Sequence, residues 1–550
     1  MSNLLQEVGL AIADGLRRKS ITTASKWAEK YRVMGGDEAG PWSFKYRPWL
    51  RGMHDSKAER NIGQKSAQMG YTETLLNLTM FAVDVKRWDV LYVLPSKTPD
   101  ASDFSSGRFN PAIELSPHLT KMFTDVQNVG HKRSGACNIY IRGSKSRNGL
   151  KGLPVGFIAL DEVEEFPEAN IPLALERASG RQEWQAWLIS TPSIADRGIN
   201  KYYNLSTKEV FTFKCPKCSK FTDLSFPECL KITADDPMDP ELQKSHLLCR
   251  ECKNKLEHEN KWEWLSDGVW IPSNSAATDR GWHVNRLYSS AAMARPAEIA
   301  KSYLLGLRDP AEATEFWNSK MGMTYEDAGA RVTETDIARR LEAYANGGLR
   351  PSGLVTLGVD IGKEIHYVVC QWAIGQYPGL DVNSGAHCRV LEIQKVLEWS
   401  DLDRVVRLWG VHSVVVDANP SMREALQFAN RFFGIVRLCI YGRGIAGKDV
   451  QISKTEEHTV LVNRTSWMDM ALSRFKRDDM LMLPSNTPFE YKSHIQTPVR
   501  VYKKDKNGNN VGYYESGDKA DHYAHAQTYA EIALKLVNFV EPNKNIESPV

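Results

Sequence analysis

Cysteine, long apolar runs and an excess of one charge are scarce or missing in this chain of 550 residues. Nine cysteines are too few for a disulfide scaffold in a protein of this length. No run approaches the ~18 uncharged apolar residues of a membrane helix, and the start, MSNLLQEVGLAIADGLRRKS, has no signal-peptide cleavage pattern. We found neither an internal repeat nor a low-complexity tract. These absences predict a cytoplasmic protein with no membrane segment.

The composition is that of an ordinary globular protein, with 42% apolar and 25% charged residues. The chain length predicts roughly three or four domains of about 150 residues each. A formal net charge of +3 does not decide whether the chain binds nucleic acid, because a local basic patch can lie on a nearly neutral whole.

Four apolar runs alternate with helical stretches in the first part of the chain: DVLYVLP, NIYIRG, GFIALDE and QAWLISTP. Their β-branched and aromatic residues predict an α/β fold, with a parallel sheet wrapped by helices. The stretch QKSAQMGYTET precedes a predicted helix, TETLLNLTMFAV, whose N-terminus would face an anion.

The eight residues from Lys65 to Thr72 have the length of a phosphate-binding loop, G-x-x-x-x-G-K-[ST], but they do not match its consensus sequence. Lysine stands at the first glycine position, and Tyr71 stands where the lysine belongs. A long side chain from Lys65 would still reach the phosphates, and Thr72 would keep its role as a Mg²⁺ ligand. The alternative is an ordinary turn.

An apolar strand, GFIAL, ends in Asp161 and Glu162. Nucleotide hydrolases use such a pair to hold Mg²⁺ and to polarise the attacking water. Apolar strands ending in two acids are also common at sheet edges. The upstream loop and the strand LISTPS just beyond favour a nucleotide hydrolase, with Asp161 on the metal and Glu162 on the water.

Four of the nine cysteines fall in two C-x-x-C pairs, which supply soft thiolate ligands suited to tetrahedral Zn²⁺. The thirty residues between the pairs exceed the usual ~15 to 20. Cys229 and His246 lie between the pairs and are spare ligand candidates, and a pair of structural thiol clusters is the alternative. We predict a structural zinc site at Cys215, Cys218, Cys249 and Cys252.

After the linker EAYANGGLRPSG, the chain turns to two apolar strands that carry Asp360 and Asp417, and a late predicted helix begins near ADHYAHAQTYA. Three acids on two strands and a helix are what two-metal phosphodiester cleavage needs. Strand-end and helix-cap carboxylates are the alternative. The helix offers Asp518, Asp521, His522 and His525.

Just upstream of that helix, RVYKKDKNGNNVGYYE predicts a β-hairpin with an Asn-Gly turn and a basic strand. This strand suits a phosphate backbone, and a solvated edge hairpin is the equal alternative.

The loop resembles the deviant Walker A motif of lambda-type phage terminase large subunits, in which the lysine moves to the start of the loop. The residues that carry the likeness are Lys65, Ser66, Ala67, Gln68, Met69, Gly70, Tyr71, Thr72 and Glu73. The likeness extends to YVLPSKTPDASDFSSGRFNP, GLPVGFIALDEVEEFP, GWHVNRLYSS and FWNSKMGMTYED.

This resemblance implies an ASCE-type P-loop NTPase domain that binds ATP through Lys65 to Thr72 and Asp161, with Glu162 as a catalytic acid. The coupling motif would be Ser190, Thr191 and Pro192. Arg177 matches a family arginine before the coupling motif and is one candidate arginine finger. The family's Leu-Arg-Gly is replaced by Leu150-Lys151-Gly152, so the nearby Arg142 and Arg147 are the other candidates.

The resemblance also implies an RNase H-like nuclease domain, matched at GVDIG, VVVDAN and ADHYAHAQTYA. Asp360 and Asp417 map onto its Mg²⁺ or Mn²⁺ ligands. Asp521 fits best as the third acid, while Asp518 or His525 could share or replace it.

The family's function implies a motor that translocates viral DNA into the procapsid and an endonuclease that cuts concatemeric DNA. Its cofactors would be ATP, Mg²⁺ or Mn²⁺, and Zn²⁺. Its partners would be double-stranded DNA, a small terminase subunit at the N-terminal helices, a portal protein at the C-terminal tail, and sister subunits in a ring. It would work in the host cytoplasm, transiently docked on the procapsid portal.

The expected domains are an N-terminal helical segment (1–40), the P-loop ATPase (41–204), a zinc-ribbon insertion (205–275), a helical subdomain and linker (276–350), the nuclease (351–536) and a tail (537–550). Two rival functions stay open. One is a DNA-repair helicase-nuclease, and the other is a non-catalytic, zinc-bearing DNA-binding scaffold.

Overall fold

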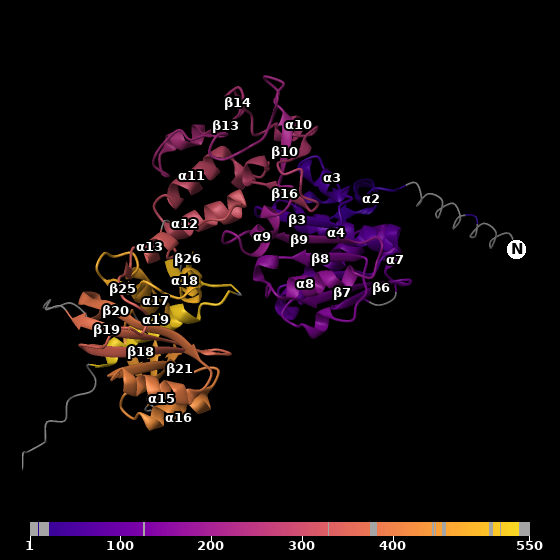
Figure 1. Ribbon diagram of the computed structural model, residues 1–550. Helices are drawn as coiled ribbons and strands as arrows, with labels where there is room; N and C mark the ends of the chain where they lie inside the picture. Colours follow the sequence, from indigo (N-terminus) through magenta and orange to yellow (C-terminus); the bar gives the residue numbers. More distant parts are fainter. Residues whose placement is uncertain are drawn as a thin grey trace, which may run out of the picture. The chain divides into compact units, whose positions relative to one another are not determined.

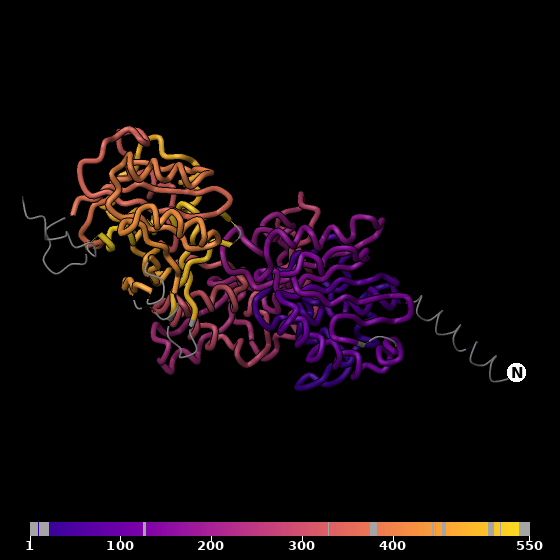
Figure 2. The backbone as a smooth tube through the Cα atoms, turned by 90° about the horizontal axis from the view of Figure 1, so that it is seen from below, coloured from indigo at the N-terminus to yellow at the C-terminus, as the bar shows by residue number. Residues whose placement is uncertain are grey.

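The computed structural model describes residue 9 and residues 21–124, 127–327, 329–374, 382–442, 445, 447–453, 458–504, 510–517 and 519–537. The chain divides into two compact units, Met1–Glu326 and Asp327–Val550. Figures 1 and 2 trace the first unit from indigo to magenta and the second from orange to yellow. Among the described residues, the longest and most apolar helices still fall short of what a membrane crossing requires.

The first unit is built on an eleven-stranded sheet with the order β11-β10-β16-β3-β9-β8-β4-β7-β6-β5 and with β15 beside β10. Seven neighbouring strands run parallel. They are β10 (Glu209–Lys214), β16 (Arg280–Val284), β3 (Arg60–Lys65), β9 (Gln185–Ser190), β8 (Phe157–Asp161), β4 (Val90–Leu94) and β7 (Cys137–Gly143). The remaining four pair antiparallel: β15 (Val269–Pro272), β11 (Phe221–Thr222), β6 (His131–Ser134) and β5 (Gln127–Asn128).

Helices cover both faces of this sheet, as the near-continuous apolar strands require. Trp27, Leu75 and Phe109 pack on one face, and Ile171 and Ile199 pack on the other. The helices of the first face are α2 (Ala24–Tyr31), α3 (Trp49–His54), α4 (Tyr71–Phe81), α6 (Asn110–Glu114) and α7 (Pro117–Met122), and those of the second are α8 (Asn170–Leu175) and α9 (Gly198–Asn204). The α/β fold with a parallel sheet is thus confirmed.

Four strands of this sheet come from segments that we expected outside the ATPase module. β10, β11 and β15 lie within the stretch expected as a zinc-ribbon insertion, and β16 lies within the expected helical subdomain. β16 pairs in parallel with β3, which is the strand that ends in Lys65. Its sequence, RGWHV, is too short and too polar to be recognised as a buried strand.

Beyond the sheet, a small three-stranded sheet carries part of the cysteine-rich segment: β12 (Leu230–Lys231), β13 (His246–Leu248) and β14 (Lys255–Leu256). Its Leu247 and Leu256 belong to the same apolar cluster as Ile299 of α11 (Pro296–Gly306). The segment therefore shares its core with the rest of the first unit. Short pieces complete the unit: β1 (Val33–Met34), β2 (Gly40–Pro41), α5 (Ser102–Phe104), α10 (Lys261–Trp264) and α12 (Pro310–Thr314).

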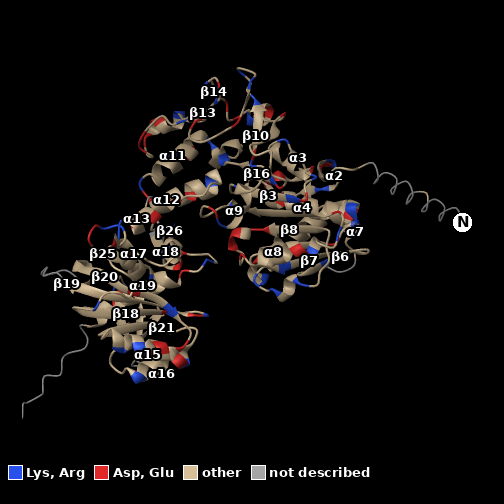
Figure 3. Cartoon of the chain, in the orientation of Figure 1, with Lys and Arg blue, Asp and Glu red and all other residues tan. Residues whose placement is uncertain are grey.

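The second unit is built on a nine-stranded mixed sheet with the order β17-β25-β20-β19-β18-β21-β22-β24-β23. β18, β19 and β20 are antiparallel, whereas β18, β21, β22 and β24 are parallel. The strands are β17 (Leu341–Glu342), β25 (Leu481–Pro484), β20 (Ala386–Val396), β19 (Ile365–Ile374), β18 (Leu354–Ile361), β21 (Ser413–Asp417), β22 (Val436–Tyr441), β24 (Thr459–Val462) and β23 (Val450–Ile452). Figure 3 shows the strands of both sheets mostly free of charged residues.

Helices lie on both faces of the second sheet as well. Leu402 and Phe428 pack on one face from α15 (Trp399–Leu408) and α16 (Met422–Arg431). The other face carries α17 (Arg464–Ser473), α18 (Phe489–Gln496) and α19 (His522–Val537). Smaller elements are α13 (Glu334–Ala338), α14 (Val382–Gly385) and the expected hairpin, β26 (Val499–Lys504) with β27 (Asn510–Glu515).

Helix α19 lies directly on the backbone of β18 at Gly358. A Cβ atom at this position would lie 1.9 Å from the carbonyl oxygen of Ala526 and 2.3 Å from the nitrogen of Ala530. Glycine is therefore required for the close approach of helix and strand.

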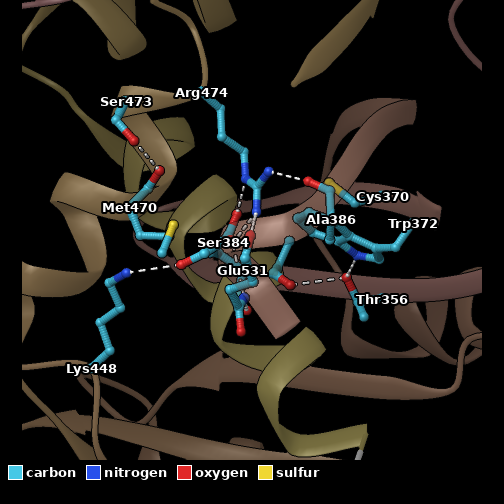
Figure 4. A network of polar contacts seen from close by, with 12 residues as sticks. Thr356, Cys370, Trp372, Ser384, Ala386, Lys448, Met470, Ser473, Arg474 and Glu531 are labelled. Carbon is cyan, nitrogen blue, oxygen red and sulfur yellow. Dashed lines mark hydrogen bonds and ion pairs between the residues drawn. The ribbon is translucent and has the colours of Figure 1, made fainter. Parts of the chain in front are cut away.

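A buried ion pair anchors α19 at Glu531, the residue after Ala530. Arg474, just after α17, donates to both carboxylate oxygens of Glu531 at 2.6 and 2.7 Å. Both side chains are almost fully buried, and Arg474 also donates to the carbonyl oxygen of Ala386. Figure 4 shows the guanidinium group directed at these partners. The guanidinium and the carboxylate therefore compensate each other's charge, which is necessary because an unpaired buried charge would strongly destabilise the fold.

Candidate functional site

The phosphate-type loop connects β3 to α4. Lys65 is the last residue of β3, and Tyr71 already begins the helix, so the connection runs from Ser66 to Gly70. Gly70 has φ 86°, a left-handed conformation that glycine adopts without strain. The loop thus leads straight into a helix N-terminus, where the helix dipole favours an anion.

Lys65 reaches back to the two acids at the end of β8. Its Nζ lies 2.7 Å from Glu162 Oε1 and 3.5 Å from Asp161 Oδ1. Burial alone would lower the pKa of Lys65, but the two carboxylates outweigh it and raise that pKa. The Tyr92 hydroxyl donates to Asp161 Oδ2 at 2.9 Å. Burial raises the pKa of the Asp161 carboxyl, and the charge of Lys65 opposes this effect.

Glu162 has an uncommon backbone conformation for a residue with a side chain. Its φ of 61° and ψ of 49° lie in the left-handed region, which costs free energy outside glycine. The side chain is 44% exposed, and its Oε2 accepts a hydrogen bond from the Ser190 hydroxyl at 3.2 Å. Such strain is typical of functional positions.

The expected coupling residues lie at the end of β9, the strand next to β8: Ser190 is its last residue, and Thr191 and Pro192 follow it. Ser190 also accepts a hydrogen bond from the Glu164 N–H at 3.3 Å, so its hydroxyl bridges the acidic turn. Thr191 lines the same cavity as Lys65, and Pro192 is buried. The structure therefore brings Ser190 into direct contact with Glu162.

A cavity of about 360 Å³ opens over this loop. It is lined by the loop, by Glu162 and Thr191, and by residues that the sequence analysis missed. Those residues are Met34, Glu38, Trp42, Arg47 and Arg108. Arg108 pairs with Glu73 at 3.2 Å, and Arg47 pairs with Glu38 at 2.7 Å. No local motif marks these positions, because they come together only through the fold.

Tyr71 belongs to the lining of this cavity, but almost all of its side chain is buried. It is 1% exposed, and its ring packs so closely on Gly63 that a Cβ there would lie 2.8 Å from it. Tyr71 is therefore a core residue of α4.

The three arginine-finger candidates lie outside the lining of this cavity. Arg142 Nη1 donates to the carbonyl oxygens of Gly130 and Ile141, and burial lowers its pKa. Arg177 Nε donates to the Leu173 carbonyl at 3.3 Å. Arg147 is exposed. An arginine that acts on a neighbouring subunit need not face its own cavity, so the geometry does not choose among them.

The structure brings the four predicted cysteine ligands together in one cluster. The Sγ atoms of Cys215, Cys218, Cys249 and Cys252 all lie within 4.8 Å of one another. The spare candidates lie elsewhere: Cys229 Sγ donates to the Asp223 carbonyl at 3.4 Å, and His246 Nδ1 contacts the Lys244 carbonyl at 2.9 Å. Four thiols at these separations fit a tetrahedral ion with Zn–S distances of about 2.3 Å.

The two C-x-x-C pairs form matching turns. In each, the N–H of the first cysteine, Cys215 or Cys249, donates at 2.9 Å to a carbonyl oxygen five residues on. In each, the residue after the second cysteine has a positive φ, 62° at Ser219 and 59° at Lys253. Such turns direct both sulfur atoms of a pair to one side, which is the geometry of a metal-binding knuckle.

In the second unit, Asp360 lies in β18 and Asp417 ends β21, the parallel neighbour of β18. Burial raises the pKa of Asp417 to about 6; the N–H of Asn419 opposes this shift and nearby Asp360 adds to it. Asp360 is 5% exposed and contacts His522 Nδ1 through Oδ2 at 2.8 Å. The sequence analysis placed His522 on the helix but gave it no role.

Asp521 lies immediately before α19. Burial opposes its ionisation, but hydrogen bonds from His525 and Ser516 and the charge of Arg464 bring its pKa down to about 2. His525 Nδ1 in turn contacts the Tyr441 hydroxyl at 2.8 Å. Asp518 lies outside the described residues. Among the described residues, Asp360, Asp417 and Asp521 do not form a group in which one oxygen from each lies within 4.8 Å of the other two.

Comparisons with known proteins find two domains of one family in this chain. The model of the phage terminase large subunit gpA ATPase domain matches residues 36–270, and that of the gpA endonuclease domain matches residues 279–378. Two domains of one phage protein thus follow each other in this chain, which defines it as a phage terminase component. The chain belongs to the gpA family of terminase large subunits.

The curated relatives share about a quarter of their residues with this chain over the matched region. The chain is 24% identical over 406 residues to the terminase large subunit of Escherichia phage lambda, covering 66% of this chain and 62% of that protein. It is 23% identical over 411 residues to that of Enterobacteria phage P21, covering 66% and 63%. The matched region therefore spans less than two thirds of either relative.

Solved structures of large terminases are also similar. That of bacteriophage HK97 has 10% identity and a TM-score of 0.48, covering 93% of this chain and 99% of that one. The large terminase ATPase domain of Thermus phage P74-26 has 14% identity and a TM-score of 0.31, covering 52% and 94%.

Proposed function

We propose that this chain is a two-enzyme DNA-packaging subunit, in which an ATPase drives DNA translocation and a metal-dependent endonuclease cuts the DNA. One observation carries the proposal most directly. Lys65 contacts both Asp161 and Glu162 beside a cavity that lies over a helix N-terminus. A lysine, two acids and a helix N-terminus are the parts that phosphoryl transfer needs.

The first unit is an ASCE-type P-loop NTPase in this proposal. Residues Lys65 to Thr72 hold the phosphates of ATP. Lys65 supplies the positive charge of the consensus lysine, whose position is occupied by Tyr71 in this loop. Thr72 and Asp161, which are close enough to share a hydrogen bond, hold Mg²⁺. Glu162 orients the attacking water, and Ser190 links Glu162 to the neighbouring strand. The arginine finger is Arg142, Arg147 or Arg177.

The cysteine-rich segment is a structural zinc ribbon in this proposal. Four thiolates in two matching turns supply a closed, all-sulfur ligand set, which suits structural rather than catalytic zinc. Because the ribbon shares its core with α11, the metal fixes its shape without being the sole source of its folding energy.

The second unit is an RNase H-like nuclease in this proposal. Asp360, Asp417 and Asp521 supply oxygen ligands for Mg²⁺ or Mn²⁺, with His525 or Asp518 as an additional or alternative ligand. Two divalent ions in such a site activate water and stabilise the leaving oxygen. His522 orients Asp360 through their 2.8 Å contact.

Basic side chains of the second unit suit a DNA backbone. A cavity of about 350 Å³ is lined by several of them: Arg331, Lys448, Lys476, Arg477 and Arg500. Arg500 belongs to β26 of the hairpin for which phosphate contact and a solvated edge were equal alternatives. Its turn residues, 505–509, lie outside the described residues.

The partners of the proposed motor are double-stranded DNA, sister subunits in a ring, a small terminase subunit and a portal protein. The last two would engage the N-terminal segment and the C-terminal tail, most of which lie outside the described residues. The complex would work in the host cytoplasm, docked on the procapsid portal.

The test is a packaging assay with purified chain, small subunit, procapsids, ATP and concatemeric DNA. DNA that becomes nuclease-resistant in proportion to ATP hydrolysed supports the motor. Strand displacement without capsid filling would instead favour the DNA-repair helicase-nuclease. A chain that binds DNA but hydrolyses no ATP would favour the scaffold.

A further inference from the structure

A second cluster of potential metal ligands lies in the second unit, apart from the three acids of the proposed nuclease site. Glu364 precedes β19, His366 is the second residue of β19, and Glu490 lies in the first turn of α18. One ligand atom from each lies within 4.8 Å of the other two. Two carboxylates and one imidazole form a donor set that binds divalent first-row ions.

The imidazole of His366 is the most informative member of this cluster. The residue is 3% exposed, and neither ring nitrogen has a hydrogen-bond partner among the described residues. The nearest carboxylate oxygen, Glu490 Oε1, lies 3.6 Å from Nε2, beyond hydrogen-bond distance. A buried polar group without a partner costs free energy, so it points to a ligand that would satisfy it.

Lys395 of β20 forms ion pairs with both acids of the cluster. Its Nζ lies 2.8 Å from Glu364 Oε2 and 3.2 Å from Glu490 Oε2. The lysine side chain is 35% exposed, and a flexible chain at the surface can withdraw its ammonium group into water. An arriving cation would therefore compete with Lys395 for the same two carboxylates.

We propose that Glu364, His366 and Glu490 bind one divalent transition ion and that Lys395 acts as its competitor within the chain. The imidazole favours Mn²⁺ or a later first-row ion over Mg²⁺, which prefers oxygen ligands. This ion is distinct from those of the proposed nuclease, because none of that site's three acids belongs to the cluster.

The ion would nevertheless lie close to the nuclease acids. His366 is the cross-strand partner of Asp360, and the ring of His522 stacks on His366 with centroids 4.6 Å apart. Because His522 contacts Asp360, an ion on His366 would hold the ring against which that contact is packed. The site would thus stiffen the surroundings of Asp360 without contributing a ligand to the nuclease.

The experiment uses the full chain with Mn²⁺ as the probe, in an Asp417→Asn, His525→Gln background that weakens the proposed nuclease site and removes its candidate imidazole ligand. Electron paramagnetic resonance measures Mn²⁺ binding, and pulsed spectra report the hyperfine coupling of a coordinated imidazole nitrogen. We expect one site with such a coupling. His366→Gln should abolish the coupling and raise the Kd for Mn²⁺ by at least about tenfold. Lys395→Met should lower the Kd by about fivefold.

The opposite directions of these two effects make the test decisive. An unchanged nitrogen coupling in His366→Gln, or an unchanged or raised Kd in Lys395→Met, would overturn the proposal. Should His366→Gln fail to fold, Glu490→Gln, at a 39% exposed side chain, takes its place and must weaken Mn²⁺ binding. The readout is binding, so failure of the nuclease assignment would leave the result interpretable.

Discussion

Lys65 Nζ and Glu162 Oε1 lie 2.7 Å apart, although the two residues are separated by 97 positions in the chain. This ion pair joins the end of β3 to the end of β8 across the intervening strand β9. A lysine at the first loop position can therefore reach the place where two strand-end acids converge.

We predict that Lys65→Ala lowers the rate of ATP hydrolysis by about 10²-fold or more. The substitution removes the ammonium group that would stabilise negative charge on the transferring phosphoryl group. Steady-state phosphate release on the purified chain measures the effect. Circular dichroism checks the fold, since Asp161 also loses its buried counter-charge. Retention of more than a tenth of the activity would contradict the role given to Lys65.

Tyr71 provides the matched control at the position where a standard loop has its lysine. Tyr71→Phe should leave ATP hydrolysis within about twofold, because the ring serves packing. Tyr71→Ala should instead destabilise the first unit by about 3 to 5 kcal/mol, as expected for a buried aromatic residue. If Tyr71→Phe abolished hydrolysis in a stable protein, the hydroxyl would have a catalytic role.

We predict one tightly bound zinc ion per chain. Cys249→Ser should remove it and lower the unfolding temperature, because one thiolate of the closed set is lost. Cys229→Ser is the control, since this buried thiol belongs to a separate contact with Asp223. Elemental analysis of both variants decides, and loss of zinc from Cys229→Ser alone would refute the ligand assignment.

The two activities should be separable by single substitutions in the full chain. Asp360→Asn keeps the side-chain shape but removes a charged oxygen ligand, so cleavage of plasmid DNA with Mg²⁺ or Mn²⁺ should fall by orders of magnitude. ATP hydrolysis should persist, because Asp161 and Glu162 are untouched. Lys65→Ala should show the reverse pattern.

Among the helix candidates for the nuclease site, Asp521→Asn should cost more activity than His525→Gln. The low pKa of Asp521 keeps it charged, which a metal ligand requires. A normal cleavage rate in Asp521→Asn would shift the third ligand to His525 or Asp518.

The ion pair between Arg474 and Glu531 should matter for stability alone. Glu531→Gln should destabilise the second unit by about 3 to 5 kcal/mol, because it leaves a buried arginine uncompensated. Denaturant unfolding followed by tryptophan fluorescence measures this, with the exposed pair of Lys244 and Glu241 as the control. A loss below about 1 kcal/mol for Glu531→Gln would show that water or other groups replace the carboxylate.

Strands β4, β8 and β9 of the first sheet were predictable from sequence because each is a nearly continuous apolar run. β4 and β8 are buried at every position, which is the pattern of a parallel strand covered on both faces. The acids after β8 were predictable for the same reason, since a strand end marks the edge of the sheet. The cysteine cluster followed from its two short, regular spacings.

Other features depend on contacts between distant segments and leave no local pattern. β16 joins the sheet beside β3 although more than two hundred residues separate them. Its polar residues do not form the alternating or continuous apolar pattern by which a strand is recognised in a sequence. The lining of the cavity by Arg47 and Arg108 and the contact between His522 and Asp360 arise in the same way. The burial of Tyr71 follows from its packing on Gly63, which a loop motif does not encode.

The bare backbone at Gly358 sets a distance as well as a packing contact. Because α19 rests on the backbone of β18 at Gly358, this glycine helps to set how far Asp360 on β18 lies from His522 at the start of α19. A side chain at this position would push the helix away from the strand and lengthen that separation. The geometry of the acidic site is thus specified by a residue that contributes no atom to it.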